Sequence, residues 1–159
     1  MEILWLGKKN PEKKTSLPCL DGTALTISTA VKNLGVIFDA SLSMEAQITK
    51  VAHQAFYHLR KAKLLAPYLT PDDLATVIHA TVTSRLDYCN SLYAGLPLAL
   101  TRKLQLVQNA AARILTRTPW KAHMRPILQQ LHWLPIEFRI KFKVLVLTFK
   151  AIAVRALHT

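Results

Sequence analysis

The sequence predicts a mainly helical α+β protein, in which a small antiparallel β unit precedes a bundle of four or more helices. Its first part combines short β-rich runs with the turn signal Asp21-Gly22. From Ser43 onward, apolar residues recur every three or four positions, which is the period of an α-helix. Hydrophobic residues make up 51% of the 159 residues, enough for a packed interior. We therefore expect a β unit at 1–40, helices at 41–98 and a basic helical region at 99–159.

Apolar runs, among them a segment with Leu25 and Ile27, supply the three or four predicted strands. Residues 2–6 form a short apolar run, and residues 17–20 lead directly into the Asp21-Gly22 turn, where glycine tolerates a positive φ. Residues 31–38 form the longest β-rich run, which Gly35 interrupts. A glycine inside a strand typically marks a bulge or the close approach of another backbone, so we expect one of these at Gly35.

The first two helices have start and stop signals. Ser43 is positioned to cap a helix that ends at Pro67, because proline breaks the helical hydrogen-bond ladder. The second helix is predicted to begin with Thr70 as N-cap and Pro71 in its first turn, and to end at Gly95. Its predicted buried face consists of Leu74, Val77, Ile78, Thr81, Val82, Leu86, Cys89 and Leu92.

Two further helices are predicted in the last third of the chain. Thr101 is expected to cap a helix from Arg102 to about Arg117. Residues 136–144 alternate as a strand would, yet the same stretch has apolar residues at helical spacing and pairs Glu137 with Lys141 at i,i+4. Pro135 and the length of the segment favour a helix.

Positive charge is concentrated near the C-terminus. Residues 99–159 contain eleven lysines and arginines and one acid, Glu137, whereas the two preceding regions are almost neutral. This asymmetry predicts a polyanionic partner, with nucleic acid first and an anionic membrane surface second. The sequence has no signal peptide and no apolar run that would span a bilayer, so we expect an intracellular protein, cytoplasmic or nuclear, with reduced Cys19 and Cys89.

The sequence predicts no catalytic and no metal site. The histidines and cysteines lack the spacing of zinc ligands, and the scattered glycines form no phosphate-binding loop. Asp72-Asp73 is the one adjacent acidic pair, and two-metal catalysis needs clustered carboxylates. A capping role behind Thr70-Pro71 is favoured for this pair. Turn chemistry accounts for Asp39, and an interhelical salt bridge or hydrogen bond is favoured for Asp87.

The basic helix is the strongest candidate for a binding surface. Helical geometry would put Arg102, Arg113 and Arg117 on one face, where they could follow a phosphate backbone. An ordinary solvated helix face is the alternative. Trp120 and Trp133 flank this region, and a core or hinge role is favoured for them over base stacking.

Several runs of residues occur together in one known family. They are residues 31–39 with the following Leu42-Ser43, residues 83–90, residues 104–113, and residues 131–135 with Phe138-Arg139-Ile140. In this order, and over roughly residues 1–152, they resemble the end of the palm, the thumb and the following region of LINE-type, non-long-terminal-repeat retrotransposon reverse transcriptases.

The resemblance implies a place within the polymerase. Residues 31–39 would match the primer-grip strand, with Asn33, Leu34 and Gly35 as its site residues. The helices from Ser43 would form the thumb, which in the family holds the template–primer duplex. The family's Tyr-x-Asp-Asp box does not occur in this sequence, which implies that the palm aspartates, and the Mg²⁺ that the intact enzyme uses, are missing. The tail from residue 153 departs from the family pattern and indicates a truncated reading frame.

We therefore interpret the chain as a truncated RNA-directed DNA polymerase that holds no cofactor and does not polymerise alone. Its retained role would be sequence-independent binding of an RNA–DNA hybrid or duplex, with the missing palm segment as a further partner and no membrane partner. Two alternatives stay open: a translated relic without selected activity, and a basic amphipathic segment on an anionic membrane. The residues predicted to contact nucleic acid are Arg102, Lys103, Arg113, Arg117, Lys121 and Arg125.

Overall fold

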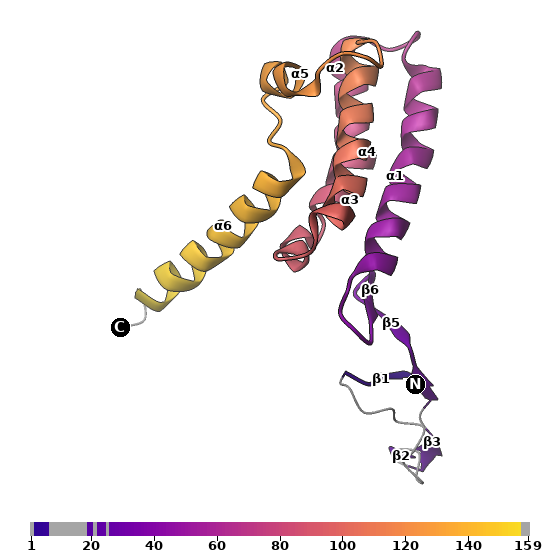
Figure 1. The fold of residues 1–159 in the computed structure, drawn as a ribbon, viewed down its shortest axis with the longest axis vertical. Coiled ribbons are helices and arrows are strands. Elements are labelled where there is room, and N and C mark those ends of the chain that lie inside the picture. The colour runs from indigo at the N-terminus through magenta and orange to yellow at the C-terminus, as the bar shows by residue number, and fades with distance from the viewer. Residues whose placement is uncertain (1, 7–18, 21, 25, 157–159) are drawn as a thin grey trace. The chain divides into compact units, whose positions relative to one another are not determined.

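A computed structural model describes residues 2–6, 19–20, 22–24 and 26–156 (Figure 1). Over these residues the chain is a mainly helical α+β protein, as the sequence predicts. It divides into two compact units, Met1–Gln47 and Ile48–Thr159. The residues of the predicted regions 41–98 and 99–159 thus lie largely together in the second, helical unit. The Cys19 side chain and Asp21 lie outside the described part of the chain.

The first unit contains short paired strands. β2 (Cys19–Leu20) and β3 (Thr23–Ala24) are antiparallel and flank the predicted Asp21-Gly22 turn, where Gly22 has φ 75°. β5 (Ala30–Asn33) and β6 (Val36–Asp39) form a second antiparallel pair. β1 (Glu2–Leu4) pairs with β4 (Thr26–Ser28) in parallel, a pairing that the sequence did not indicate.

The predicted strand at residues 31–38 is in fact a hairpin. Asn33 pairs with Val36, and Leu34 and Gly35 between them have φ 46° and 86°. Two consecutive residues with positive φ make the tight turn that matches the twist of a hairpin. The expectation of a bulge or a close backbone approach at Gly35 was therefore wrong, because the glycine allows the chain to reverse.

Asp39 organises the connection from β6 to α1 (Glu45–Leu65). Its carboxylate accepts hydrogen bonds from the backbone N–H groups of Ser41, Ser43 and Met44 at 3.1, 2.9 and 2.9 Å. The Ser41 and Ser43 hydroxyls also donate to it. Ser43 Oγ in turn accepts from Glu45 N–H at 3.3 Å. The turn role predicted for Asp39 and the capping role predicted for Ser43 are confirmed.

The second predicted helix begins as expected and then changes its winding. In α2 (Pro71–Ile78), Thr70 Oγ1 accepts from the Asp73 N–H at 3.2 Å and donates to the Asp73 carboxylate at 2.6 Å, which confirms the capping role. A π-helical turn, η2 (His79–Thr83), and the short α3 (Ser84–Asp87) follow. Cys89 then adopts a left-handed conformation with φ 53° before the 3₁₀ turn η3 (Asn90–Tyr93).

Three helices complete the second unit: α4 (Leu98–Thr116), α5 (Met124–Gln130) and α6 (Ile136–Ala156). The helical interpretation of the last segment is confirmed. Thr101 is not the cap of α4, because the helix already starts at Leu98, after Pro97. The Thr101 side chain is buried, and its hydroxyl donates to the Leu98 carbonyl at 3.3 Å.

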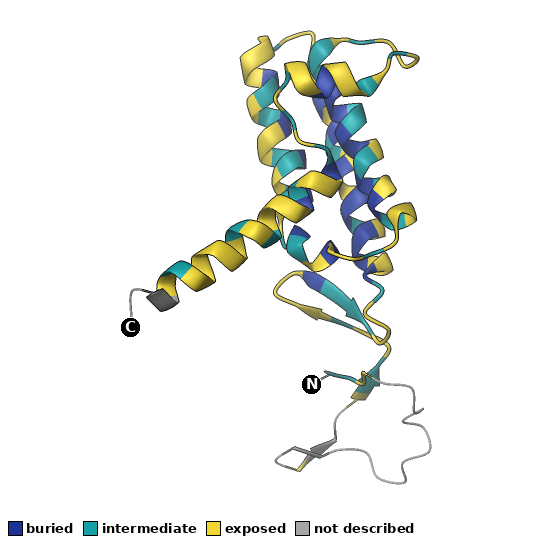
Figure 2. Cartoon of the chain, turned by 60° about the vertical axis from the view of Figure 1, so that its left-hand side comes forward, coloured by how far each residue is buried: buried dark blue, intermediate teal, exposed yellow. Residues whose placement is uncertain are grey.

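The core of the second unit lies between α1, the α2–α3 segment and α4 (Figure 2). Leu74, Ile78, Val82 and Leu86 of the predicted face are buried, whereas Leu92 is exposed because the chain leaves the helix before it. The remaining fully or nearly buried apolar residues of this core are Ile48, Val51, Ala52, Ala55, Leu59, Ala62, Leu104, Val107, Ala111 and Ala112. α5 adds a smaller cluster of Ala112, Ile127 and Leu128.

Candidate nucleic-acid interface

The connection from α4 to α5 gathers basic residues around an exposed tryptophan. The Arg113 guanidinium carbon lies 4.6 Å from the centroid of the Trp120 ring, a distance typical of a cation–π contact. Trp120 is 76% exposed, so the core half of the predicted core or hinge role is wrong for it. We call Arg113, Arg117, Trp120, Lys121 and Arg125 the α4–α5 patch.

Backbone geometry explains why these residues gather. Arg117 is the C-cap of α4 with φ 53°, and its N–H donates to the Arg113 carbonyl, as does the Thr118 N–H at 3.2 Å. This left-handed residue ends the helix and turns the chain toward α5. Ile127 and Leu128 of α5 then pack on Ala112 of α4, which keeps the connection close to the helix end.

The six predicted contact residues form two groups rather than one stripe. Arg102 and Lys103 lie near the start of α4, about 17 Å and about 15 Å along the helix axis from Arg113. Arg102 is exposed, whereas Lys103 is half-buried and donates to Thr49 Oγ1 at 3.3 Å. Arg117 does not share a helical face with Arg102 and Arg113, because the helix has ended before it.

Within the patch, the basic side chains differ in their exposure to solvent. Arg117, Lys121 and Arg125 are exposed and are free to approach a phosphate. Arg113 is half-buried, and within the described chain its buried Nε has no hydrogen-bond partner. Arg113 is therefore better suited to hold the Trp120 ring in position than to make a phosphate contact through Nε.

The sequence segment that contains the patch has no acidic residue. Residues 88–136 contain no aspartate or glutamate. Glu137, the one acid after residue 88, accepts from Lys141 Nζ at 2.7 Å, which confirms the predicted i,i+4 pair. Asp87 binds the Arg139 guanidinium through both oxygens, with the Nε–Oδ1 distance at 2.9 Å, so its predicted role in an interhelical salt bridge is confirmed.

The second tryptophan has the structural role predicted for it. Trp133 packs on the cluster of Ala112, Ile127 and Leu128. Its ring contacts the His79 ring edge-on, with 5.4 Å between the two ring centroids. The sequence offered no signal that separates the two tryptophans. Trp120 follows Pro119 in the α4–α5 connection, and Trp133 precedes Pro135 in the α5–α6 connection.

The predicted primer-grip residues lie at the tip of the β5–β6 hairpin in the first unit. Asn33 closes the turn, and Leu34 and Gly35 form it. All three are exposed. They thus lie on an exposed two-residue turn.

Neither a metal-binding cluster nor a membrane-spanning helix occurs among the described residues. Among them, no three histidine, cysteine, aspartate or glutamate side chains lie close enough together to hold a metal ion. Within the same residues, every helix is too short or too polar to cross a membrane.

Comparison of the chain with models of known protein families, with curated proteins and with solved structures finds no match. The resemblance to reverse transcriptases therefore depends on the sequence runs themselves.

Proposed function

We propose that the helical unit binds nucleic acid without sequence preference, through the α4–α5 patch. The observation that carries this proposal is an exposed tryptophan, stacked on Arg113, within a stretch that has exposed cations and no acid. Cations track the phosphate backbone, and an exposed aromatic ring can stack on a base whatever its identity. Together they favour nucleic acid over other polyanions.

The resemblance to reverse transcriptases supports an RNA–DNA hybrid or a duplex as the ligand, because the thumb of these enzymes holds the template–primer. Arg117, Lys121 and Arg125 would contact phosphates, and Trp120 would stack on a base at an unpaired or terminal position. Arg102 and Lys103 would meet the backbone further along α4. No polymerase chemistry is proposed for this chain, because Asp72-Asp73 is its one adjacent acidic pair and Asp73 is engaged in capping α2.

The test is a salt titration of binding to a labelled RNA–DNA hybrid, followed by fluorescence anisotropy. Three phosphate contacts correspond to a slope of about −2.7 in log K against log salt. The triple variant Arg117→Glu, Lys121→Glu, Arg125→Glu is expected to flatten the slope by about that amount and to weaken binding by more than about tenfold at low salt. Trp120→Ala is expected to weaken binding to an overhang more than to a blunt duplex, because stacking needs an accessible base.

The matched control reverses the same amount of charge elsewhere. Arg60, Lys61 and Lys63 are exposed on α1, and changing all three to glutamate alters the net charge as much as the patch variant does. If both triple variants lose affinity equally, the patch is not the binding surface. If the affinity does not depend on salt concentration, or if no binding is detected, the chain lacks this activity and is a translated relic.

A further inference from the structure

Thr118 lies in the α4–α5 connection, between two cations of the α4–α5 patch. Arg117 precedes it, and Pro119-Trp120-Lys121 follows it. The structure has neither helix nor strand at Thr118 and Pro119. Because proline disfavours the helical conformation of the residue before it, an extended backbone is favoured at Thr118. Protein kinases bind their substrates as extended segments, so this threonine has the local conformation of a kinase substrate.

The residues after Thr118 match the selectivity of one class of kinase. Proline-directed kinases require proline directly after the hydroxyl that they phosphorylate, and the cyclin-dependent members also prefer a basic residue three positions after it. Pro119 and Lys121 occupy these two positions. Proline has a fixed φ and no N–H, and lysine complements an acidic pocket, so both residues can be selected by a binding groove.

The other Thr-Pro dipeptide of the chain, Thr70-Pro71, has the opposite surroundings. Asp73 occupies the position three residues after Thr70, which Lys121 occupies in the first case. The Thr70 hydroxyl also donates to the Asp73 carboxylate at 2.6 Å and accepts from the Asp73 N–H at 3.2 Å. A phosphate on this hydroxyl would be repelled by Asp73 and would break the cap of α2. Thr70 is therefore an internal comparison within the same chain.

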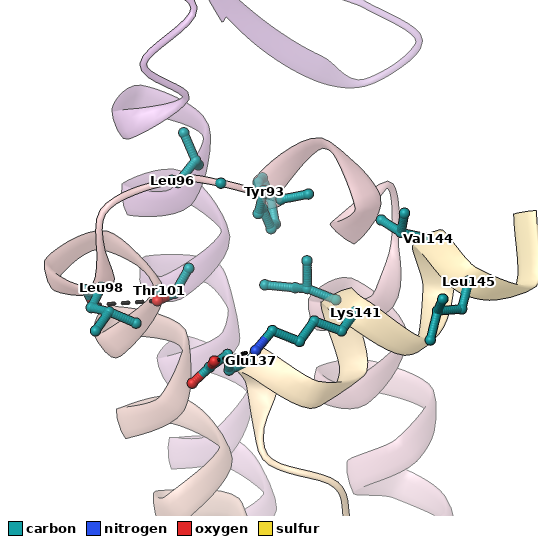
Figure 3. Close-up of a pocket in the computed structure, with 11 residues that line it drawn as sticks. Tyr93, Leu96, Leu98, Thr101, Glu137, Lys141, Val144 and Leu145 are labelled. Atoms are coloured by element: carbon teal, nitrogen blue, oxygen red, sulfur yellow. Dashed lines mark hydrogen bonds and ion pairs between the residues drawn. The ribbon is translucent and has the colours of Figure 1, made fainter. Parts of the chain in front are cut away.

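The other described threonines of residues 99–156 lie within helices. Thr101 is buried in the wall of an apolar groove of about 510 Å³, and its hydroxyl donates to the Leu98 carbonyl (Figure 3). Thr116 and Thr148 each donate to the carbonyl four residues earlier, at 2.9 and 3.0 Å. Residues 99–156 contain no serine or tyrosine. Within them, Thr118 is thus the one hydroxyl-bearing residue outside a helix.

The hydrogen bonds of Thr118 are local. Its hydroxyl lies 2.6 Å from Thr116 Oγ1, and because Thr116 donates its own proton to a carbonyl of α4, Thr118 is the donor of this pair. The Thr118 N–H donates to the Arg113 carbonyl at 3.2 Å, at the end of α4. Helix ends open at low cost in free energy, so the segment can enter a kinase groove without unfolding the core.

A phosphate on Thr118 would enter a region of positive charge. Phosphothreonine carries a charge of about −1.5 to −2 at pH 7. The patch supplies four cations, and residues 88–136 contain no aspartate or glutamate. Lysine and arginine form strong charge-assisted hydrogen bonds with phosphate. A phosphate attached to the chain would therefore compete with the phosphates of a nucleic acid for the same cations.

We propose that Thr118 is a phosphorylation site for a proline-directed protein kinase, and that its phosphate weakens nucleic-acid binding by the α4–α5 patch. The kinase would transfer the γ-phosphoryl group of ATP to Thr118 Oγ1. The bond between the γ-phosphorus and the β–γ bridging oxygen breaks, the Oγ1–P bond forms, the hydroxyl proton passes to the catalytic aspartate of the kinase, and ADP leaves. The effect on binding rests on the proposed function, because it is the regulation of that same patch.

The first experiment tests the modification site. The full chain is incubated with MgATP and a purified cyclin-dependent kinase, and phosphorylated residues are located by mass spectrometry. We expect phosphate on Thr118 and none on Thr70. Pro119→Ala and Lys121→Ala should each slow the incorporation by about fivefold or more, whereas Thr118→Ser should retain it, because serine keeps the hydroxyl. Absence of phosphate from Thr118, or equally fast modification of Thr70, would overturn the proposal.

The second experiment compares the unmodified and the phosphorylated chain in the salt titration with the labelled RNA–DNA hybrid. Neutralising about two cations should flatten the slope of log K against log salt by about 1.8 and weaken binding at low salt by about fivefold or more. Thr118→Ala treated with the same kinase should keep the affinity of the unmodified chain. Unchanged affinity after phosphorylation would overturn the regulation and leave the proposed function in place. Absence of binding before phosphorylation would overturn both.

Discussion

Replacing Gln108 by alanine is expected to destabilise the helical unit by about 1–3 kcal/mol. The Gln108 side chain is buried in α4, and its Nε2 donates to the Leu134 carbonyl at 2.8 Å. Its Oε1 accepts from Gln105 Nε2 at 2.9 Å. Gln105 Oε1 in turn accepts from the Ile136 N–H, the first residue of α6, at 2.9 Å. Alanine would break this chain of hydrogen bonds and leave space around it. Urea unfolding followed by circular dichroism at 222 nm measures the loss.

Two variants separate the causes of this loss. Gln108→Met keeps most of the volume without the amide, so it reports the hydrogen bonds apart from the cavity. Gln130→Ala changes an exposed glutamine of α5 and is expected to alter stability by no more than about 0.5 kcal/mol. A Gln108→Ala effect as small as that of Gln130→Ala would mean that the glutamine pair does not hold the start of α6.

Gln105 and Gln108 make contacts that the periodicity of the sequence could not predict. The period of apolar residues predicts that α4 buries Leu104, Val107, Ala111, Ile114 and Leu115. The structure buries the first three and leaves Ile114 and Leu115 half-buried. Gln108 lies on the same side but is polar, and its partner is the backbone of Leu134, 26 residues away. A backbone partner carries no side-chain signal, so no residue pattern could reveal the contact.

For the second predicted helix, local signals predicted the start but not the interior. The Thr70–Pro71 start of α2 was predictable because capping involves neighbouring residues. The π turn at His79–Thr83 and the left-handed Cys89 were not, because neither has a residue marker such as glycine or proline in the sequence. The apolar stripe continues through Val82 in the π turn to Leu86 in α3. Periodicity alone therefore predicts one uninterrupted helix.

The sequence predicted which basic residues could form the candidate site but not how they are grouped in the fold. The charge asymmetry pointed to the last third of the chain, and four of the six named cations lie in the α4–α5 patch, for which we propose nucleic-acid binding. Their grouping depends on Arg117, whose positive φ ends α4 one residue after Thr116. An arginine in that conformation is uncommon and has no sequence marker, whereas glycine would have indicated the turn. The exposure of Trp120 follows from the same turn.

Protonation of Asp39 is expected to occur near pH 2, well below the ordinary range for aspartate. Burial raises the pKa of this carboxyl, but the Ser41 hydroxyl, the Ser43 and Met44 N–H groups and the Ser43 hydroxyl together lower it from 3.8 to about 2. The charged form is thus favoured in the folded state. Because the folded pKa is depressed, its stabilising contribution is present above about pH 4 and is lost as the pH falls through 2.

Two-dimensional NMR can follow this titration at single residues. The Ser43 and Met44 amide protons are hydrogen-bonded to the carboxylate at 2.9 Å, so their chemical shifts report its charge. We expect both shifts to change with a midpoint close to pH 2. Asp39→Asn keeps an oxygen acceptor but removes the titrating charge, so this low-pH change should disappear. Asp39→Ala also removes the acceptor and should cost about 1–2 kcal/mol at neutral pH.

The order of amide protection in the wild type, Asp39→Asn and Asp39→Ala tests whether the negative charge of Asp39 stabilises the connection to α1. If the charge strengthens the hydrogen bonds at the start of α1, the amides of Ser43 and Met44 should be most protected from exchange in the wild type at neutral pH. Protection should be intermediate in Asp39→Asn and lowest in Asp39→Ala. Wild-type protection should approach the Asp39→Asn level below pH 2, because a protonated carboxyl and an amide are both neutral acceptors. A midpoint at 3.8 would contradict the stabilised carboxylate, since the hydrogen bonds would then not distinguish the charged from the neutral form.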